Sequence, residues 1–173
     1  NSHPIFVTGG SSGCQILQNM VHDSVHGFGI IVVYSTNCYV DDNVVAKCNR
    51  TAIYASETTN VEIRGNSVGD RIGVHGNGIA TYSNSSGIKV LDNDVYMPSG
   101  GICFAHERSA GSIIAGNVLC GANNPSVRGG SQLVDMHLDK TAKLHWVDKI
   151  TRQMRHCAPR LSKADTVTAG EFI

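Results

Sequence analysis

Between residues 34 and 108, this 173-residue sequence carries the side-chain types that perform acid–base catalysis. Acid–base chemistry on a carboxylate-bearing substrate needs a cation to neutralise the carboxylate, a base to remove a proton and an acid to return one. The cation candidates are Arg71 and Arg108, the base candidates His75 and His106, and the acid candidates Tyr34 and Tyr82. We predict that the catalytic residues are His106, Tyr82 and Arg108. We predict that the substrate-binding residues are Tyr34, Glu57, Asp70, Arg71, His75 and Glu107.

An internal repeat must position these residues. A short segment centred on asparagine recurs five times, with spacings of 24, 23, 27 and 24 residues. The repeated asparagines are Asn19, Asn43, Asn66, Asn93 and Asn117. Ile or Val stands three residues before each of them, and Val or Leu stands two residues after. A period near 24 with alternating apolar residues predicts a solenoid of about five β coils.

The repeated asparagine predicts a ladder inside the solenoid. A buried amide must be hydrogen-bonded, and a column of stacked Asn side chains meets this need when each donates to the next coil. A second motif recurs at Ile5, Ile30, Ile53, Ile79 and Ile102. Alignment on this motif places Tyr34, Glu57, Ser83 and His106 in one outward-facing column.

The connection from Asn66 to Ile79 is longer than the corresponding connections in the other coils. Inserted residues usually form a protruding loop, and functional residues concentrate on such loops. This loop carries Asp70, Arg71 and His75. We expect the ligand to lie beside it, on the face formed by the strands that follow Ile30, Ile53, Ile79 and Ile102.

Residues 4–121 resemble the right-handed parallel β-helix of the pectate-lyase-like superfamily, including its Asn ladder. The resemblance implies an all-β fold and a secreted, periplasmic or virion-surface location. The hexapeptide FAHERS (residues 104–109), followed by IIAGN, is similar to the catalytic coil of mannuronan C5-epimerases. His106 and Glu107 match that motif, whereas Phe104 and Ala105 replace its Asp-Pro.

Two functions follow from these residues and from the resemblance. The leading hypothesis is a carbohydrate-active β-helix that binds, and lyses or epimerises, an acidic polysaccharide. The alternative is a non-catalytic structural, surface or virion module, because the β-helix fold hosts both kinds of protein.

Composition excludes several other classes of partner. Lys and Arg together number 14, as do Asp and Glu, so the chain lacks the basic excess of a nucleic-acid-binding protein. No apolar run reaches membrane-spanning length. We therefore expect a polysaccharide partner, no nucleic acid and no membrane, and we leave the oligomeric state open.

Three further motifs have simple structural explanations. The loop Thr8–Gly13 is similar to the nucleotide loop of short-chain dehydrogenases, but it lacks the following Ile-Gly, so we expect a turn between strands. His22 and His26 are four residues apart, and we expect them to face solvent without a metal. Cys14 and Cys38 share one repeat position, and we expect stacked free thiols. We predict no cofactor, with a calcium ion left open.

The repeat predicts one β-helix domain over residues 1–121 and an extension over residues 122–173. All thirteen Asn residues precede residue 125, so composition changes near this boundary. Residues 132–157 contain no Gly or Pro and space their apolar side chains with helical periodicity. We therefore expect a helix there that caps the open end of the solenoid.

Overall fold

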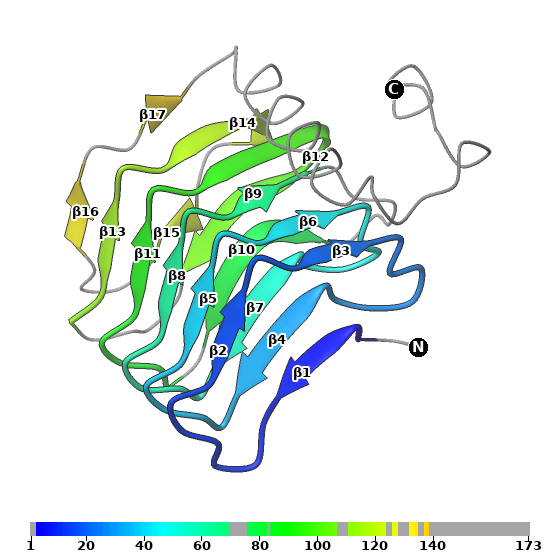
Figure 1. The fold of residues 1–173 in the computed structure, drawn as a ribbon. Helices are drawn as coiled ribbons and strands as arrows, with labels where there is room; N and C mark the ends of the chain where they lie inside the picture. Colours follow the sequence, from blue (N-terminus) through cyan, green and yellow to red (C-terminus); the bar gives the residue numbers. More distant parts are fainter. Residues whose placement is uncertain are drawn as a thin grey trace.

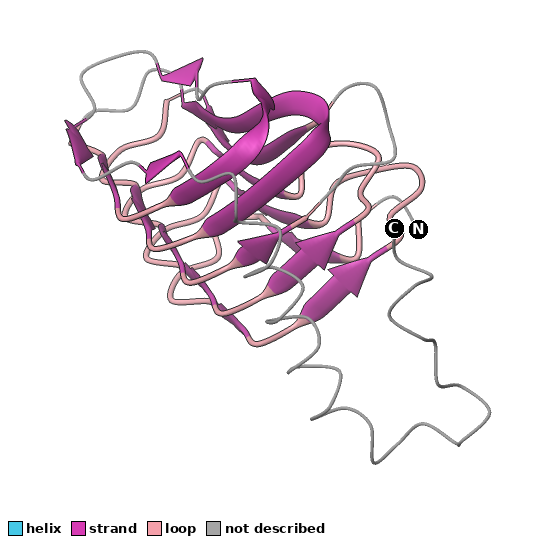
Figure 2. Cartoon of the chain, turned by 90° about the horizontal axis from the view of Figure 1, so that it is seen from above, coloured by secondary structure: helices cyan, strands magenta, loops and turns pink. Residues whose placement is uncertain are grey.

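In the computed structural model, the described residues are 3–69, 76–82, 84–106, 111–123, 126–127, 132–134 and 137–138. For residues 98–104, 106 and those from 119 onward, the description covers the backbone alone. Every regular element of the described residues is a β-strand, as Figure 2 shows. The expected all-β solenoid is confirmed.

The chain winds through three faces in turn, and each strand pairs in parallel with the strand one coil away. Face 1 consists of β1 (Ile5–Val7), β4 (Ile30–Val33), β7 (Ile53–Ser56), β10 (Asn77–Tyr82), the end of β12 (Asp94–His106) and β15 (Ser126–Val127). Face 2 consists of β2 (Gln15–Leu17), β5 (Tyr39–Asp41), β8 (Glu62–Arg64), β11 (Lys89–Leu91), β13 (Ile113–Ala115) and β16 (Gln132–Val134). Face 3 consists of β3 (Met20–His22), β6 (Val44–Ala46), β9 (Ser67–Val68), the start of β12, β14 (Val118–Asn123) and β17 (His137–Leu138). Figure 1 shows the strands of each face side by side in chain order.

The core consists of columns of like side chains, because the parallel register brings the same repeat position of each coil together. On face 1, Ile30, Ile53 and Ile79 pair in register and are completely buried. On face 2, Val40, Ile63 and Val90 form an equivalent buried column. Burying one such side chain stabilises a fold by about 1.5–3 kcal/mol. The alternation of buried and outward-facing residues along each strand then follows from the pleat.

The predicted Asn ladder is confirmed at the corner between faces 2 and 3. Each Asn donates its Nδ2 to the Oδ1 of the next Asn, over distances of 2.8–3.0 Å from Asn19 through Asn117. The backbone N–H of the same Asn also donates to that Oδ1. For example, the N–H of Asn43 donates to Asn66 Oδ1 at 2.9 Å. From the second coil onward, Nδ2 also donates to the coil before, as Asn66 does to the carbonyl of Val40 at 2.9 Å. The ladder therefore satisfies buried backbone and side-chain groups together.

The strand pairing between the fourth and fifth coils departs from the expected register. Ile79 pairs with Phe104, and Asn77 pairs with Ile102, so the Gly-Ile dipeptide at residue 101 is not stacked on the one at residue 78. The physical reason is β12, which runs unbroken from face 3 to face 1, with a register shift between Met97 and Ile102 in its pairing with β14. The expected alignment of Ile102 with Ile79 is therefore wrong by two residues.

The coils also continue past the boundary predicted at residue 121. That position lies inside β14, and β15, β16 and β17 pair with β12, β13 and β14. The expected helix over residues 132–157 is wrong at its start, because residues 132–134 and 137–138 are strands. Main-chain pairing to the preceding coil outweighs helical periodicity there. The rest of that helix and of the 122–173 extension lies outside the described residues.

Candidate functional site

Tyr34 and Glu57, two of the predicted binding residues, lie together where β4 and β7 leave face 1. The backbone N–H of Tyr34 donates to the carbonyl of Ser56 at 3.3 Å, which places Tyr34 beside Glu57 of the next coil. A side-chain hydrogen bond to the Glu57 carboxylate, together with its negative charge, raises the pKa of Tyr34 above 10.0. Both residues have positive φ, 49° and 53°, at this corner. The pair offers a hydroxyl and a carboxylate to solvent.

Tyr82, a predicted catalytic residue, belongs to a row of aromatic rings that crosses the outer surface of face 1. We call Phe28, Tyr54 and Tyr82 the aromatic row. The ring centroids of Phe28 and Tyr54 are 5.0 Å apart, and those of Tyr54 and Tyr82 are 5.9 Å apart. Asn77 Nδ2 donates to the Tyr82 hydroxyl at 3.0 Å. The row thus spans three coils, and its rings are half-buried.

A cation lies at one end of the aromatic row. The guanidinium carbon of the exposed Arg50 is 5.7 Å from the ring centroid of Phe28, which is within the range of a cation–π contact. The sequence analysis missed Phe28, Tyr54 and Arg50. Tyr54 was detectable, because it stands between the inward-facing Ile53 and Ala55, but Phe28 and Arg50 lie in connections whose paths the repeat does not specify.

His106 does not share a register position with Tyr34 and Glu57. Its backbone pairs with Thr81, and Thr81 pairs in turn with Ala55 of β7. The predicted single column of Tyr34, Glu57 and His106 is therefore wrong, as a direct consequence of the two-residue register difference in β12. The His106 side chain, Glu107, Arg108, Asp70, Arg71, His75 and Ser83 lie outside what the structure describes, so their predicted roles stay predictions.

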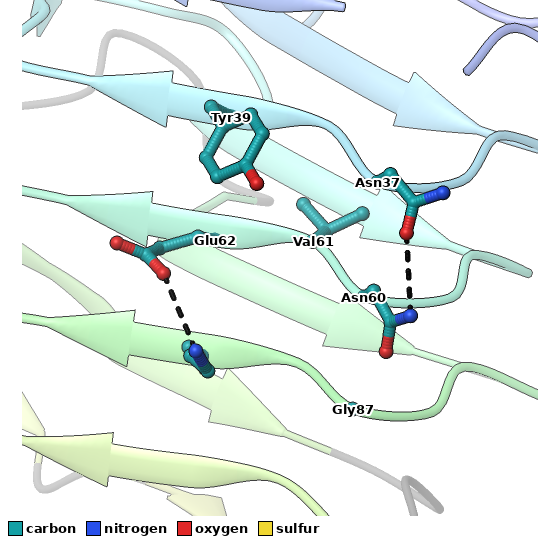
Figure 3. A pocket seen from close by; sticks show the side chains of 7 residues that line it. Asn37, Tyr39, Asn60, Val61, Glu62 and Gly87 are labelled. Carbon is teal, nitrogen blue, oxygen red and sulfur yellow. Dashed lines mark hydrogen bonds and ion pairs between the residues drawn. The ribbon is translucent and has the colours of Figure 1, made fainter. Parts of the chain in front are cut away.

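A second surface feature, which we call the corner groove, lies between faces 1 and 2. It has an empty volume of about 370 Å³ that includes space open to solvent. It is lined by Asn37, Tyr39, Asn60, Val61, Glu62, Gly87 and Lys89. Asn60 Nδ2 donates to Asn37 Oδ1 at 3.2 Å, and Lys89 Nζ lies 3.6 Å from Glu62 Oε2, as Figure 3 shows. The sequence analysis did not single out this groove.

The structure describes the positions of the three motifs that were given simple structural explanations. Cys14 and Cys38 are free thiols in adjacent coils, and burial raises the pKa of Cys38. Residues 8–13 form a turn between β1 and β2 and open no helix, so they do not resemble a nucleotide-binding loop in structure. His22 and His26 are exposed, and His22 Nδ1 lies 2.7 Å from Asp23 Oδ2. Within the described ranges, no group of three or more His, Cys, Asp or Glu side chains is placed to hold a metal ion.

No described helix has the length and apolar character needed to cross a membrane. Neither the curated proteins nor the solved structures contain a match to this chain. One protein family, described as "Periplasmic copper-binding protein (NosD)", matches residues 2–143. The periplasmic location in that description agrees with the expected secreted or periplasmic location. On this match over most of its length, the chain belongs to the NosD family.

Proposed function

We propose that this NosD-family β-helix binds an acidic polysaccharide along face 1. The observation that carries the proposal is the aromatic row with Arg50 at its end. Aromatic side chains offer large apolar surfaces with polar edges, and ligand sites combine such surfaces with a few placed polar groups. The apolar C–H faces of sugar rings fit the rings, and the guanidinium fits a uronate carboxylate.

The solenoid repeats equivalent surface positions from coil to coil, which suits binding of a polymer. Successive coils present equivalent positions about 4.8 Å apart, so an extended polymer can meet a similar contact at each coil. The Tyr34–Glu57 pair directly follows β4 and β7 of face 1. It supplies a hydrogen-bond donor and acceptor for sugar hydroxyls. These features favour a linear glycan over a compact small molecule.

The catalytic part of the hypothesis assigns His106 as the base, Tyr82 as the acid and Arg108 as the cation, with Asp70, Arg71, His75 and Glu107 in substrate binding. Its test is incubation of the full chain with alginate, pectate and hyaluronan. A lyase releases unsaturated product that absorbs in the ultraviolet, and an epimerase changes the uronate ratio measured by NMR. His106→Ala should abolish either activity. No product from any of the three glycans would favour the non-catalytic module.

Copper is the second ligand to consider, because the family is described as copper-binding. Copper prefers thiolate, thioether and imidazole ligands. Among the described residues no three Cys or His donors converge: Cys38 stacks on Cys14 alone, the buried Cys48 Sγ lies near a backbone carbonyl, and His22 pairs with Asp23. The described part of the chain therefore does not fit a copper site, and we derive no copper chemistry from it.

Affinity electrophoresis tests the glycan proposal directly. The full chain should migrate more slowly in gels that contain alginate or pectate than in gels that contain uncharged dextran. Tyr54→Ala should remove most of the retardation, whereas Tyr54→Phe, which keeps the ring, should retain it. Arg50→Gln should weaken retention in the acidic glycans only. Equal mobility in all gels, with the fold intact by circular dichroism, would refute the proposal.

A further inference from the structure

The corner groove has a different chemical character from the aromatic row. Tyr39, Glu62 and Lys89 occupy one register position on the adjacent strands β5, β8 and β11. Asn37 and Asn60 occupy the corner just before these strands, where their φ values are 52° and 55°. Figure 3 shows the Tyr39 ring next to the Glu62 carboxylate, with the two amides at the same side of the groove. Three coils therefore contribute to a single depression.

The amides of the groove form a directed chain. Asn60 donates to Asn37 at 3.2 Å, and Asn37 Nδ2 lies 3.4 Å from the Ser12 hydroxyl. This leaves the Asn60 Oδ1 at the end of the chain, and no hydrogen bond to it is found among the described residues. A Cβ on Gly87 would lie only 2.5 Å from that oxygen, so the absence of a side chain at Gly87 keeps the acceptor open.

The charges of the groove are balanced. Lys89 Nζ and Glu62 Oε2 are 3.6 Å apart, and their side chains are 51% and 25% exposed. A charged ligand would have to displace one partner from the other, whereas an uncharged ligand leaves the pair intact. The second carboxylate oxygen of Glu62 can still accept hydrogen bonds from hydroxyl groups.

We infer that the corner groove is a subsite for a neutral pyranose sugar. The Tyr39 ring, 44% exposed, supplies a surface for the C–H face of the sugar. Glu62 and Asn60 Oδ1 accept hydrogen bonds from neighbouring hydroxyls. Since the groove is open to solvent, we expect a single sugar to bind weakly. This inference does not depend on the acidic-glycan proposal for face 1, because the residues and the ligand charge differ.

Saturation-transfer NMR with glucose, galactose and mannose, each alone, tests the inference on the full chain. At least one of the three should receive saturation from the protein, and galacturonate should receive several-fold less at the same concentration. Tyr39→Ala and Asn60→Gly should each remove most of the signal. The second variant suits the positive φ at residue 60 and removes the whole side chain that carries the acceptor.

Two matched controls keep the result interpretable. Tyr39→Phe retains the ring and should retain binding. Leu17→Ala removes a similarly exposed apolar side chain from outside the groove and should change nothing. Absence of saturation for all three sugars would overturn the inference, as would an unchanged signal in Tyr39→Ala. Stronger saturation of galacturonate than of every neutral sugar would also overturn it. Retardation in acidic gels is a separate measurement, so the failure of one proposal is distinguishable from the failure of the other.

Discussion

Asp42 and Gly65 occupy the same corner of successive coils, and the side chain of one fills the space that the other lacks. Both have positive φ, 53° and 61°. Asp42 Oδ1 lies 2.5 Å from the point where a Cβ of Gly65 would stand. Asp92 is placed in the same way over Gly116, and Asn60 over Gly87. At these three places, a corner residue with a side chain is followed by a glycine in the next coil.

This relationship predicts that substitution by alanine lowers the stability more at Gly65 than at Gly13. Gly65→Ala must both adopt a left-handed conformation, at about 1–2 kcal/mol, and displace Asp42. Gly13→Ala has the same kind of positive φ, 69°, but nothing within 4 Å of the added Cβ. Urea denaturation should show a lower free energy of unfolding for both variants, with Gly65→Ala lower by about a further 1 kcal/mol. Equal losses of unfolding free energy in the two variants would show that displacing Asp42 costs no stability.

Because of the Asn ladder, the loss of stability on removing one Asn side chain should depend on the position of that Asn along the solenoid. Asn66→Ala removes the acceptor of the buried Asn43 backbone N–H, and it removes the side-chain bonds of residue 66 to Asn43 Nδ2, the Val40 carbonyl and Asn93 Oδ1. Leaving the buried N–H unpaired costs about 1–3 kcal/mol and each further lost bond about 1 kcal/mol, so unfolding should be easier by about 3 kcal/mol or more. Asn19→Ala, at the half-exposed end of the ladder, should cost about 1 kcal/mol. Thermal denaturation of the two variants provides the comparison.

Cys48 predicts a loss of stability at alkaline pH. Burial raises the pKa of its thiol from the ordinary 9.0 to about 12. Above pH 9 the unfolded chain releases this proton while the folded chain keeps it. The stability linked to Cys48 is therefore fully present below pH 9 and is lost as the pH rises toward about 12, by up to about 1.4 kcal/mol per pH unit. The difference in unfolding free energy between wild type and Cys48→Ala, measured from pH 8 to pH 11, should shrink along this slope. A constant difference would contradict the prediction.

The Tyr34–Glu57 contact predicts a coupled titration at the corner of face 1. Because the Glu57 carboxylate accepts the hydrogen bond and carries a negative charge, Glu57→Gln should lower the pKa of Tyr34 toward 10.0. NMR of labelled tyrosine Cζ resolves the individual titrations. Glu62→Gln is the matched control and should leave the pKa of Tyr34 unchanged, because Glu62 is not among the groups that raise it. An unchanged Tyr34 titration would mean that the two side chains do not interact in solution.

The repeat determined the solenoid, the Asn ladder and the columns of Ile and Val directly from the sequence. Stacked coils bring like positions into contact, so a residue such as Asn66 must match Asn43 and Asn93 for its hydrogen bonds to form. The spacing of the repeated residues in a single sequence therefore indicates the fold. The stacking of Cys14 with Cys38 and the pairing of Tyr34 with Glu57 follow from the same rule, because the first three coils keep one register.

Only the tertiary structure decided the register of His106, the aromatic row and the corner groove. The unbroken strand β12 shifts the pairing by two residues, and strand pairing depends on partners distant in sequence rather than on a local dipeptide. Phe28 and Arg50 reach the aromatic row from connections between strands, whose paths vary with length and carry no repeat. The groove depends on Tyr39, Glu62 and Lys89, which occupy one repeat position but differ from coil to coil. A repeat identifies what recurs, whereas a binding surface depends on the residues that do not.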